Sequence, residues 1–220
     1  MSCNQGSESE KSEDESGIRQ IGPNTRVIPA EEVPAEPGEI TPQTNPEDYL
    51  SPQEILNEKG FNITKQARQE LLRTLIKTVR EKGVTGAIEY CNLAALPMLD
   101  SMSKAEDVEI SRVSHRPRNP ANDANDDESG MITYYMNQQK EQGSMAPVMH
   151  EMEDYIYHVS PILLKEMVCL KCHGEKGKDI AAEDYIAISL SYPNDQATGY
   201  KRNEIMGLWI AKFRRDQVFN

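Results

Sequence analysis

The chain has 220 residues, a formal net charge of −12 and a sequence pI near 4.9, with 37% hydrophobic and 6% aromatic residues. This composition predicts an acidic, soluble protein with a modest core. It argues against a nucleic-acid partner, because an acidic surface repels a phosphate backbone, and no stretch approaches the ~20 apolar residues that a membrane-spanning helix needs.

The first 48 residues have the composition of a tether. Prolines recur among Glu, Ser and Thr, and residues 7–16 are acidic and serine-rich, so this segment cannot bury enough apolar surface to fold. Cys3 resembles the lipid-acceptor cysteine of a mature bacterial lipoprotein; the alternative is an incidental cysteine in a flexible tail. We therefore expect a disordered acidic and proline-rich tether over residues 1–48 and a folded domain over residues 49–220.

The domain should open with helices. Ser51 and Glu54 predict a capping box at the start of a short helix that ends near Gly60. A long amphipathic helix should follow and end near Gly83, with an apolar stripe that covers a sheet or, alternatively, supports a homodimer. A further helix should begin at Val84 and be interrupted at Pro97. The stripe of the long helix consists of Ile63, Ala67, Leu71, Leu75 and Val79.

The rest of the chain has mostly extended character. Alternating or β-branched runs predict strands over residues 108–113, 155–160, 185–192 and 207–213, and residues 129–142 predict a short helix that ends at Gly143. Four strands that follow helices through short loops favour an antiparallel sheet with its helices on one side. The expected fold class is therefore α+β.

The most informative motif is Cys169-Leu170-Lys171-Cys172-His173, the attachment signature of c-type haem. Each cysteine can add across one vinyl group of the porphyrin, and the adjacent imidazole can bind the iron as proximal ligand. The alternatives are a zinc half-site, a redox dithiol and a dispensable disulfide. Zinc would need a second pair of ligands, whereas Cys3 and Cys91 are isolated, and a glycine-rich charged loop replaces the long helix of a thioredoxin-like site. The motif favours one covalent haem c, attached outside the cytoplasm.

Arg112, Arg116 and Arg118 form the densest cationic segment of this acidic chain. Haem carries two propionates, and planar guanidinium groups are suited to bidentate binding of carboxylates. The three arginines are therefore candidate propionate contacts. The alternative is that they pair with the surplus surface acids.

Cys91 shares a helix face with Ala87, Ile88, Ala94 and Ala95. An alanine-lined surface around one cysteine would let a flat macrocycle approach closely. The same pattern is typical of a tightly packed helix pair, and spacing alone favours an ordinary buried thiol.

Four blocks of the sequence occur in an order that points to one family. They are residues 87–91, residues 112–114 leading into 118–122, residues 169–174, and Gly199-Tyr200 followed by Gly207. Together they resemble a family of single-haem c-type proteins, first catalogued as a domain of unknown function. The resemblance implies a PAS-like haem fold, found as the extracytoplasmic input of bacterial sensor kinases and in stand-alone periplasmic or cyanobacterial proteins. It also implies iron ligation by His173 and by the thiolate of Cys91. Two departures are the absence of the glycine expected in the turn over residues 199–204 and the acidic loop over residues 121–128.

Other side chains compete for the sixth coordination position of the iron, because Met/His and bis-His haems are common. A thiolate favours ferric iron and lowers the redox potential, whereas a methionine thioether raises it. The methionines also fit as core residues. The competing candidates are Met98, Met102, Met145, Met149, His150, Met152 and His158.

A low-spin, six-coordinate haem has no open site, so we do not expect an enzyme. The sequence favours an extracytoplasmic, low-potential cytochrome that senses redox state or a small ligand: reduction weakens the iron–thiolate bond, and the helix of Cys91 shifts. The alternatives are a low-potential electron-transfer carrier and a lipid-anchored binding module in which the haem is structural. The expected partner is a redox protein or a separate signalling protein, and the expected location is the periplasm or the cell surface, with a lipid on Cys3.

Overall fold

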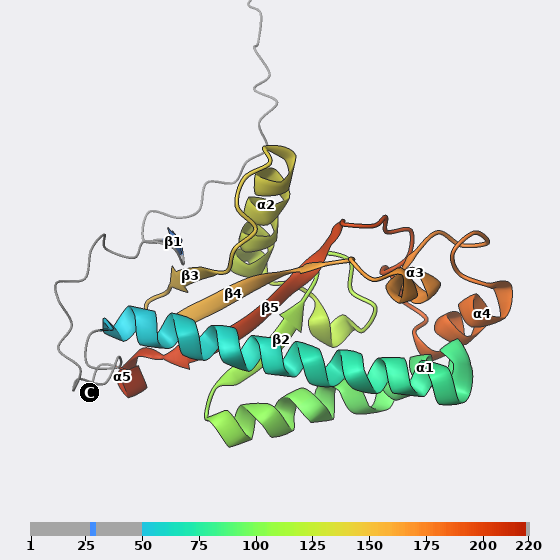
Figure 1. Cartoon of the computed structure of the whole chain (residues 1–220), viewed down its shortest axis with the longest axis horizontal. Helices are drawn as coiled ribbons and strands as arrows, with labels where there is room; N and C mark the ends of the chain where they lie inside the picture. The colour runs from blue at the N-terminus through green and yellow to red at the C-terminus, as the bar shows by residue number, and fades with distance from the viewer. Residues whose placement is uncertain (1–26, 30–49, 219–220) are drawn as a thin grey trace, which may run out of the picture.

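The computed structural model describes residues 27–29 and 50–218 (Figure 1). The predicted tether, Cys3 included, therefore lies outside the described residues apart from one short strand. In chain order the elements are β1 (Val27–Pro29), α1 (Pro52–Glu106), β2 (Glu109–Val113), a 3₁₀ turn (Pro120–Asn122), α2 (Asp126–Lys140), β3 (Val148–Glu151), β4 (Tyr155–Leu163), α3 (Met167–His173), α4 (Ala182–Ser191), β5 (Ile205–Arg214) and α5 (Arg215–Val218).

Helix α1 begins as the sequence predicts and then differs from the prediction. The Ser51 side chain accepts a hydrogen bond from the Glu54 amide, and the Glu54 carboxylate accepts one from the Ser51 amide, so the capping box is confirmed. Gly83, at φ 70°, turns the chain, so α1 consists of a first arm before this glycine and a second arm after it (Figure 1). The expected interruption at Pro97 is wrong, because the second arm continues through it.

The expected helix end at Gly60 is also wrong, and the structure gives the glycine another role. Gly60 is buried where the first arm crosses β4, and a Cβ atom there would clash with the Cβ of His158. The glycine thus permits a close approach of helix and strand rather than a helix end.

The sheet has five antiparallel strands in the order β1-β3-β4-β5-β2. The strands predicted over residues 108–113, 155–160 and 207–213 correspond to β2, β4 and β5. Strand β3 was not predicted, because its first three residues are all buried and therefore show no alternation. Helix α2 begins three residues before its predicted start, at a second capping box made by Asn125 and Glu128.

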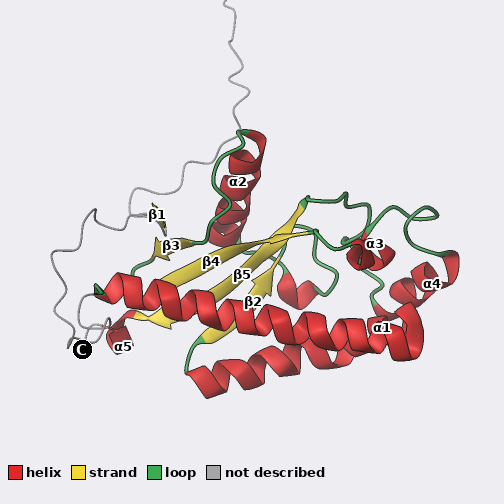
Figure 2. Ribbon diagram, viewed as in Figure 1, coloured by secondary structure: helices red, strands yellow, loops and turns green. Residues whose placement is uncertain are grey.

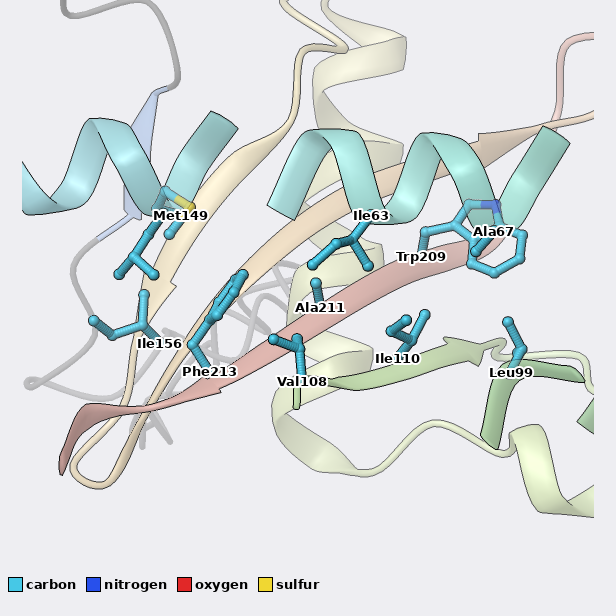
Figure 3. Packing of buried hydrophobic residues seen from close by; sticks show 11 residues of the cluster. Ile63, Ala67, Leu99, Val108, Ile110, Met149, Ile156, Trp209, Ala211 and Phe213 are labelled. Atoms are coloured by element: carbon cyan, nitrogen blue, oxygen red, sulfur yellow. The ribbon is translucent and has the colours of Figure 1, made fainter. Parts of the chain in front are cut away.

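Helices cover both faces of the sheet, which corrects the expectation that they lie on one side (Figure 2). Trp209, Ala211 and Phe213 of β5 pack toward α1 in the cluster of Figure 3. Leu208 and Ile210, on the opposite face of the same strand, pack with α2. Strand β5 is apolar on both faces and is buried almost throughout, as central strands are.

The segment 185–192 was predicted as a strand and is instead helix α4. Ile188 and Tyr192 are buried four positions apart, as on a helix, whereas Ile186 and Leu190 are 60% and 80% exposed. A short apolar run fits either the helical or the strand period. Here contact with the second arm of α1 favours the helix. The α+β class is confirmed. None of the described helices is long and apolar enough to span a membrane.

Candidate functional site

A cavity of about 260 Å³ lies between the two arms of α1, the segment that follows β2, and helix α3. Its apolar wall continues the stripe of the first arm, with Leu71, Leu72, Leu75 and Val79. The structure brings seven of the eight predicted site residues to this one cavity, and the eighth, Cys3, lies outside the described residues. The seven are Cys91, Arg112, Arg116, Arg118, Cys169, Cys172 and His173.

His173 is the last residue of α3, and its ring is held in a defined orientation. Nδ1 lies 2.8 Å from the carbonyl oxygen of Ala197, a distance at which Nδ1–H donates and Nε2 keeps its lone pair. Burial, together with the charge of Arg118, lowers the pKa of His173 to about 3, although the Ala197 hydrogen bond acts in the opposite direction. The imidazole is therefore neutral at physiological pH, which is the form that binds a metal.

The loop before β5 holds the end of α3 through backbone hydrogen bonds. The amide of Gly199 donates to the Gly174 carbonyl at 2.7 Å, and the amide of Tyr200 donates to the His173 carbonyl at 2.9 Å. The amide of Gln196 donates to the Pro117 carbonyl at 3.1 Å, so the same loop also binds the segment after β2. Three segments that are distant in sequence thus meet around His173.

The turn before β5, which lacks the expected glycine, forms with an asparagine instead. Asn203 adopts φ 67°, a left-handed conformation that asparagine tolerates better than most residues. Its amide donates to the carbonyl of Leu164 at 2.7 Å, which fixes the turn against the end of β4.

The three candidate arginines have different environments. Arg118 forms an ion pair with Asp195, with 3.0 Å between Nε and Oδ1. Arg116 lies over the Tyr200 ring at 4.0 Å and donates to the carbonyls of Gln196 and Thr198. The guanidinium of Arg112 lies 5.4 Å from the centre of the Trp209 ring; its Nε is buried and has no hydrogen-bond partner among the described residues.

The three cysteines of the cavity are free thiols. Burial raises the pKa of Cys91, and the positive charges of Arg112 and Arg118 oppose that shift. Burial likewise raises the pKa of Cys169, and that of Cys172 to about 11. The protein environment thus favours the neutral thiol form of all three cysteines.

Comparison with known proteins gives a clear family. The sequence profile of the Tll0287-like family matches residues 44–213. The chain belongs to this family. It is similar in structure to the crystal structure of the cyanobacterial haem protein Tll0287, with a TM-score of 0.52 and 16% sequence identity over 78% of this chain and 98% of that one. At this identity the likeness shows the fold. No curated protein matches the sequence.

The competing sixth ligands do not line the cavity of this Tll0287-like protein. Met98, Met102 and Met149 pack in or against the core cluster between α1 and the sheet, and Met145 packs against the cluster under α2. His150 and His158 are buried in the sheet. The cavity wall does contain Met206, which the sequence analysis missed because it lies in a strand and in no motif. Within the described residues, no three His, Cys, Asp or Glu side chains gather in a way that could hold a metal ion.

Proposed function

We propose that this protein binds one haem in the cavity, covalently through Cys169 and Cys172, with His173 and Cys91 as axial ligands. One observation carries the proposal: a histidine, three free thiols and three arginines, supplied by α1, β2, the segment after β2 and α3, line the same largely apolar cavity. The structural neighbour Tll0287 is a haem protein, which supports the same cofactor. When bound, the haem supplies a one-electron ferric/ferrous couple.

The donor set of the cavity fits this group. His173 offers Nε2, because Nδ1–H is used by the Ala197 carbonyl. Arg112 offers a buried Nε that lacks a partner among the described residues, and a buried cation needs a compensating anion. We therefore assign a propionate to Arg112 before the other two arginines, whose guanidinium groups already contact protein carbonyls.

Cys91 is the better candidate for the sixth ligand than Met206. The thiol lies on the second arm of α1, flanked in the cavity wall by Ala87 and Ala95, whose small side chains leave room for a ring. Met206 lies in the same cavity wall, where it packs against Leu164 and Tyr200 as a core residue does.

We propose sensing of redox state or of a small ligand as the role of this site. The second arm of α1 begins at the Gly83 turn and ends at Glu106; the next residue, Asp107, has φ 52° and turns the chain toward β2. A change in the contacts of Cys91 would therefore bias a helix that is connected at both ends by sharp turns. No enzymatic activity is proposed. The expected setting is the periplasm or the cell surface, with a lipid on Cys3 and a separate signalling protein as partner.

Low-potential electron transfer is the second candidate, and one observation favours it. Three large apolar side chains are exposed on α3, which contains the cysteine pair, and on α4: Met167 at 63%, Ile186 at 60% and Leu190 at 80%. Exposed apolar side chains beside a cofactor are typical of a surface that contacts a redox partner.

The test of ligation is the electron paramagnetic resonance spectrum of the ferric protein, expressed with haem-attachment machinery. We expect a low-spin thiolate signal that disappears in Cys91→Ala and persists in Met206→Leu, the matched change at the methionine sulfur of the wall. A spectrum that changes in Met206→Leu and not in Cys91→Ala would overturn the assignment of Cys91. A wild-type chain that carries no haem would overturn the proposed function itself.

Sensing and electron transfer can be separated by one reductive cycle. A sensor should exchange Cys91 or take up CO after reduction, which would appear as a shifted absorption band in stopped-flow spectra. A carrier should keep both axial ligands and return to its initial spectrum on reoxidation, because ligand exchange slows electron transfer. The second result would favour the carrier.

A further inference from the structure

The ion pair between Arg118 and Asp195 is better shielded from solvent than the other ion pairs of this charge-rich protein among the described residues. The two side chains are 12% and 7% exposed, and 3.0 Å separates Nε of Arg118 from Oδ1 of Asp195. The other ion pairs among the described residues each have at least one side chain more than a third exposed. A pair removed from water in this way requires good geometry and additional hydrogen bonds, and the structure provides both.

Both partners of the pair bind the backbone of Ala197. Oδ1 of Asp195 accepts a hydrogen bond from the Ala197 amide at 3.0 Å, while Nη2 of Arg118 lies 3.3 Å from the Ala197 carbonyl oxygen. The same Nη2 donates to the carbonyl of Cys172 at 2.5 Å. The pair therefore ties the loop before β5 to the last turn of α3.

The Ala197 carbonyl is also the acceptor of the His173 ring. Nδ1 of His173 lies 2.8 Å from this oxygen, so the imidazole and the guanidinium share one acceptor. The position of the carbonyl, and the electron density it can offer to the ring N–H, both depend on Arg118 and Asp195. In metal sites, such outer partners fix the orientation of a histidine ligand and tune its basicity.

We propose that Arg118 and Asp195 are a positioning pair that sets the orientation and the basicity of His173, and through it the redox potential of the bound haem. This inference rests on the proposed function and reassigns Arg118, which sequence reasoning offered as a propionate contact. Arg118 acts on the proximal ligand from behind, whereas Arg112 is the arginine with an unpaired buried nitrogen among the described residues.

The two members of the pair should act with opposite signs. Without the guanidinium, the Ala197 carbonyl becomes a stronger acceptor, His173 becomes more basic, and the negative charge of Asp195 is left uncompensated. Each of these changes favours ferric iron and lowers the potential. Without the carboxylate, the guanidinium charge is uncompensated, which favours ferrous iron and raises the potential. If the pair had only a structural role, the redox potentials of the two single variants would not shift in opposite directions.

The experiment compares the midpoint potentials of the haem-loaded wild type, Arg118→Gln, Asp195→Asn and the double variant by spectroelectrochemistry. We expect a lower potential in Arg118→Gln, a higher one in Asp195→Asn, and a value between the two in the double variant. Arg118→Lys, which keeps the charge without the fork of donors, should recover part of the shift. Arg215→Gln is the matched control, because it breaks an ion pair with Glu151 in the strand region, with 2.7 Å between Nη2 and Oε2.

Haem content, measured by mass spectrometry and by the pyridine haemochrome spectrum, accompanies every potential. Haem-loaded single variants whose potentials match that of Arg215→Gln would overturn the positioning role. Shifts of the same sign in both single variants would overturn it as well. If Arg118→Gln does not retain haem, the midpoint potentials of Asp195→Asn and Arg118→Lys still give the sign of the shift that each partner causes. A wild type without haem would instead contradict the proposed function, so the two failures are distinguishable.

Discussion

The first arm of α1 packs against two very different regions, although its apolar stripe is continuous. Ile63 and Ala67 contact the sheet in a filled core, where their exposed fractions are 3% and 0% (Figure 3). Leu75 and Val79, further along the same stripe, are only half-buried and line the cavity. The same helical period thus covers a close-packed core at one end and a cofactor-sized cavity at the other.

The difference between the two regions lies in the layer opposite the helix. Beneath the first half of the arm, β5 offers Trp209, Ala211 and Phe213, which fill the space. Opposite the second half, α3 offers two thiols and an imidazole, and the end of β2 with the segment after it offers three guanidinium groups. A stripe of apolar residues therefore does not by itself distinguish a core from a pocket.

The largest expected effect is the difference in the free energy of unfolding between Ile63→Ala and Leu75→Ala. Each change removes three carbons from the same arm. We expect Ile63→Ala to lower the free energy of unfolding by about 3 kcal/mol, because a cavity opens in a filled core. In the haem-free chain, Leu75→Ala should cost less than about 1 kcal/mol, because its side chain already borders a cavity. Urea denaturation measures both, and equal losses would mean that the two regions are packed alike.

A smaller effect should appear in the pH dependence of the packed region. Burial lowers the pKa of His158 to about 4, from an unfolded value near 6.5. Because the folded state disfavours protonation of His158, the contribution of this residue to the free energy of unfolding is fully present above pH 6.5. It is lost as the pH falls toward 4. The loss between pH 7 and pH 5 should be about 2 kcal/mol.

The measurement compares urea denaturation of the wild type and of His158→Gln at the two pH values. The variant removes the titrating ring, so its stability should fall less steeply than that of the wild type. Parallel curves would show that His158 does not contribute. The absolute stability of the variant does not enter the comparison, because the lost contacts with Asn57 and Ser160 act at both pH values.

The smallest expected effect concerns two helical glycines. Gly60→Ala places a Cβ against the Cβ of His158, and the clash should outweigh the gain in helix propensity by about 1 kcal/mol. Gly130, inside α2, has open space around its Cβ position, so Gly130→Ala should stabilise the protein by about 0.5–1 kcal/mol. Thermal unfolding would reveal the opposite signs, and stabilisation by both changes would contradict the close contact at Gly60.

Much of the local structure could be predicted from the sequence, because it depends on residues that are close together in the chain. The Ser51 capping box, the alternating or β-branched strands β2, β4 and β5, and the start of the second arm after Gly83 depend on neighbouring residues. Errors occurred where a distant contact decides. Residues 185–192 form a helix in which Ile188 packs against the second arm of α1, and Gly60 lies inside a helix, where its missing Cβ makes room for His158.

The site shows the same division. The sequence by itself determined which donor groups the chain offers, because two thiols and an imidazole lie within the five residues Cys169–His173. It also determined the α+β class through its periodicities. The tertiary structure decided that Cys91 faces the same cavity as His173, that Met206 enters the wall, and that Arg118 pairs with Asp195. These relations join residues that are distant in sequence. The hydrogen bonds that orient the site use backbone carbonyls, and because every residue has one, no sequence motif indicates which carbonyl will be used.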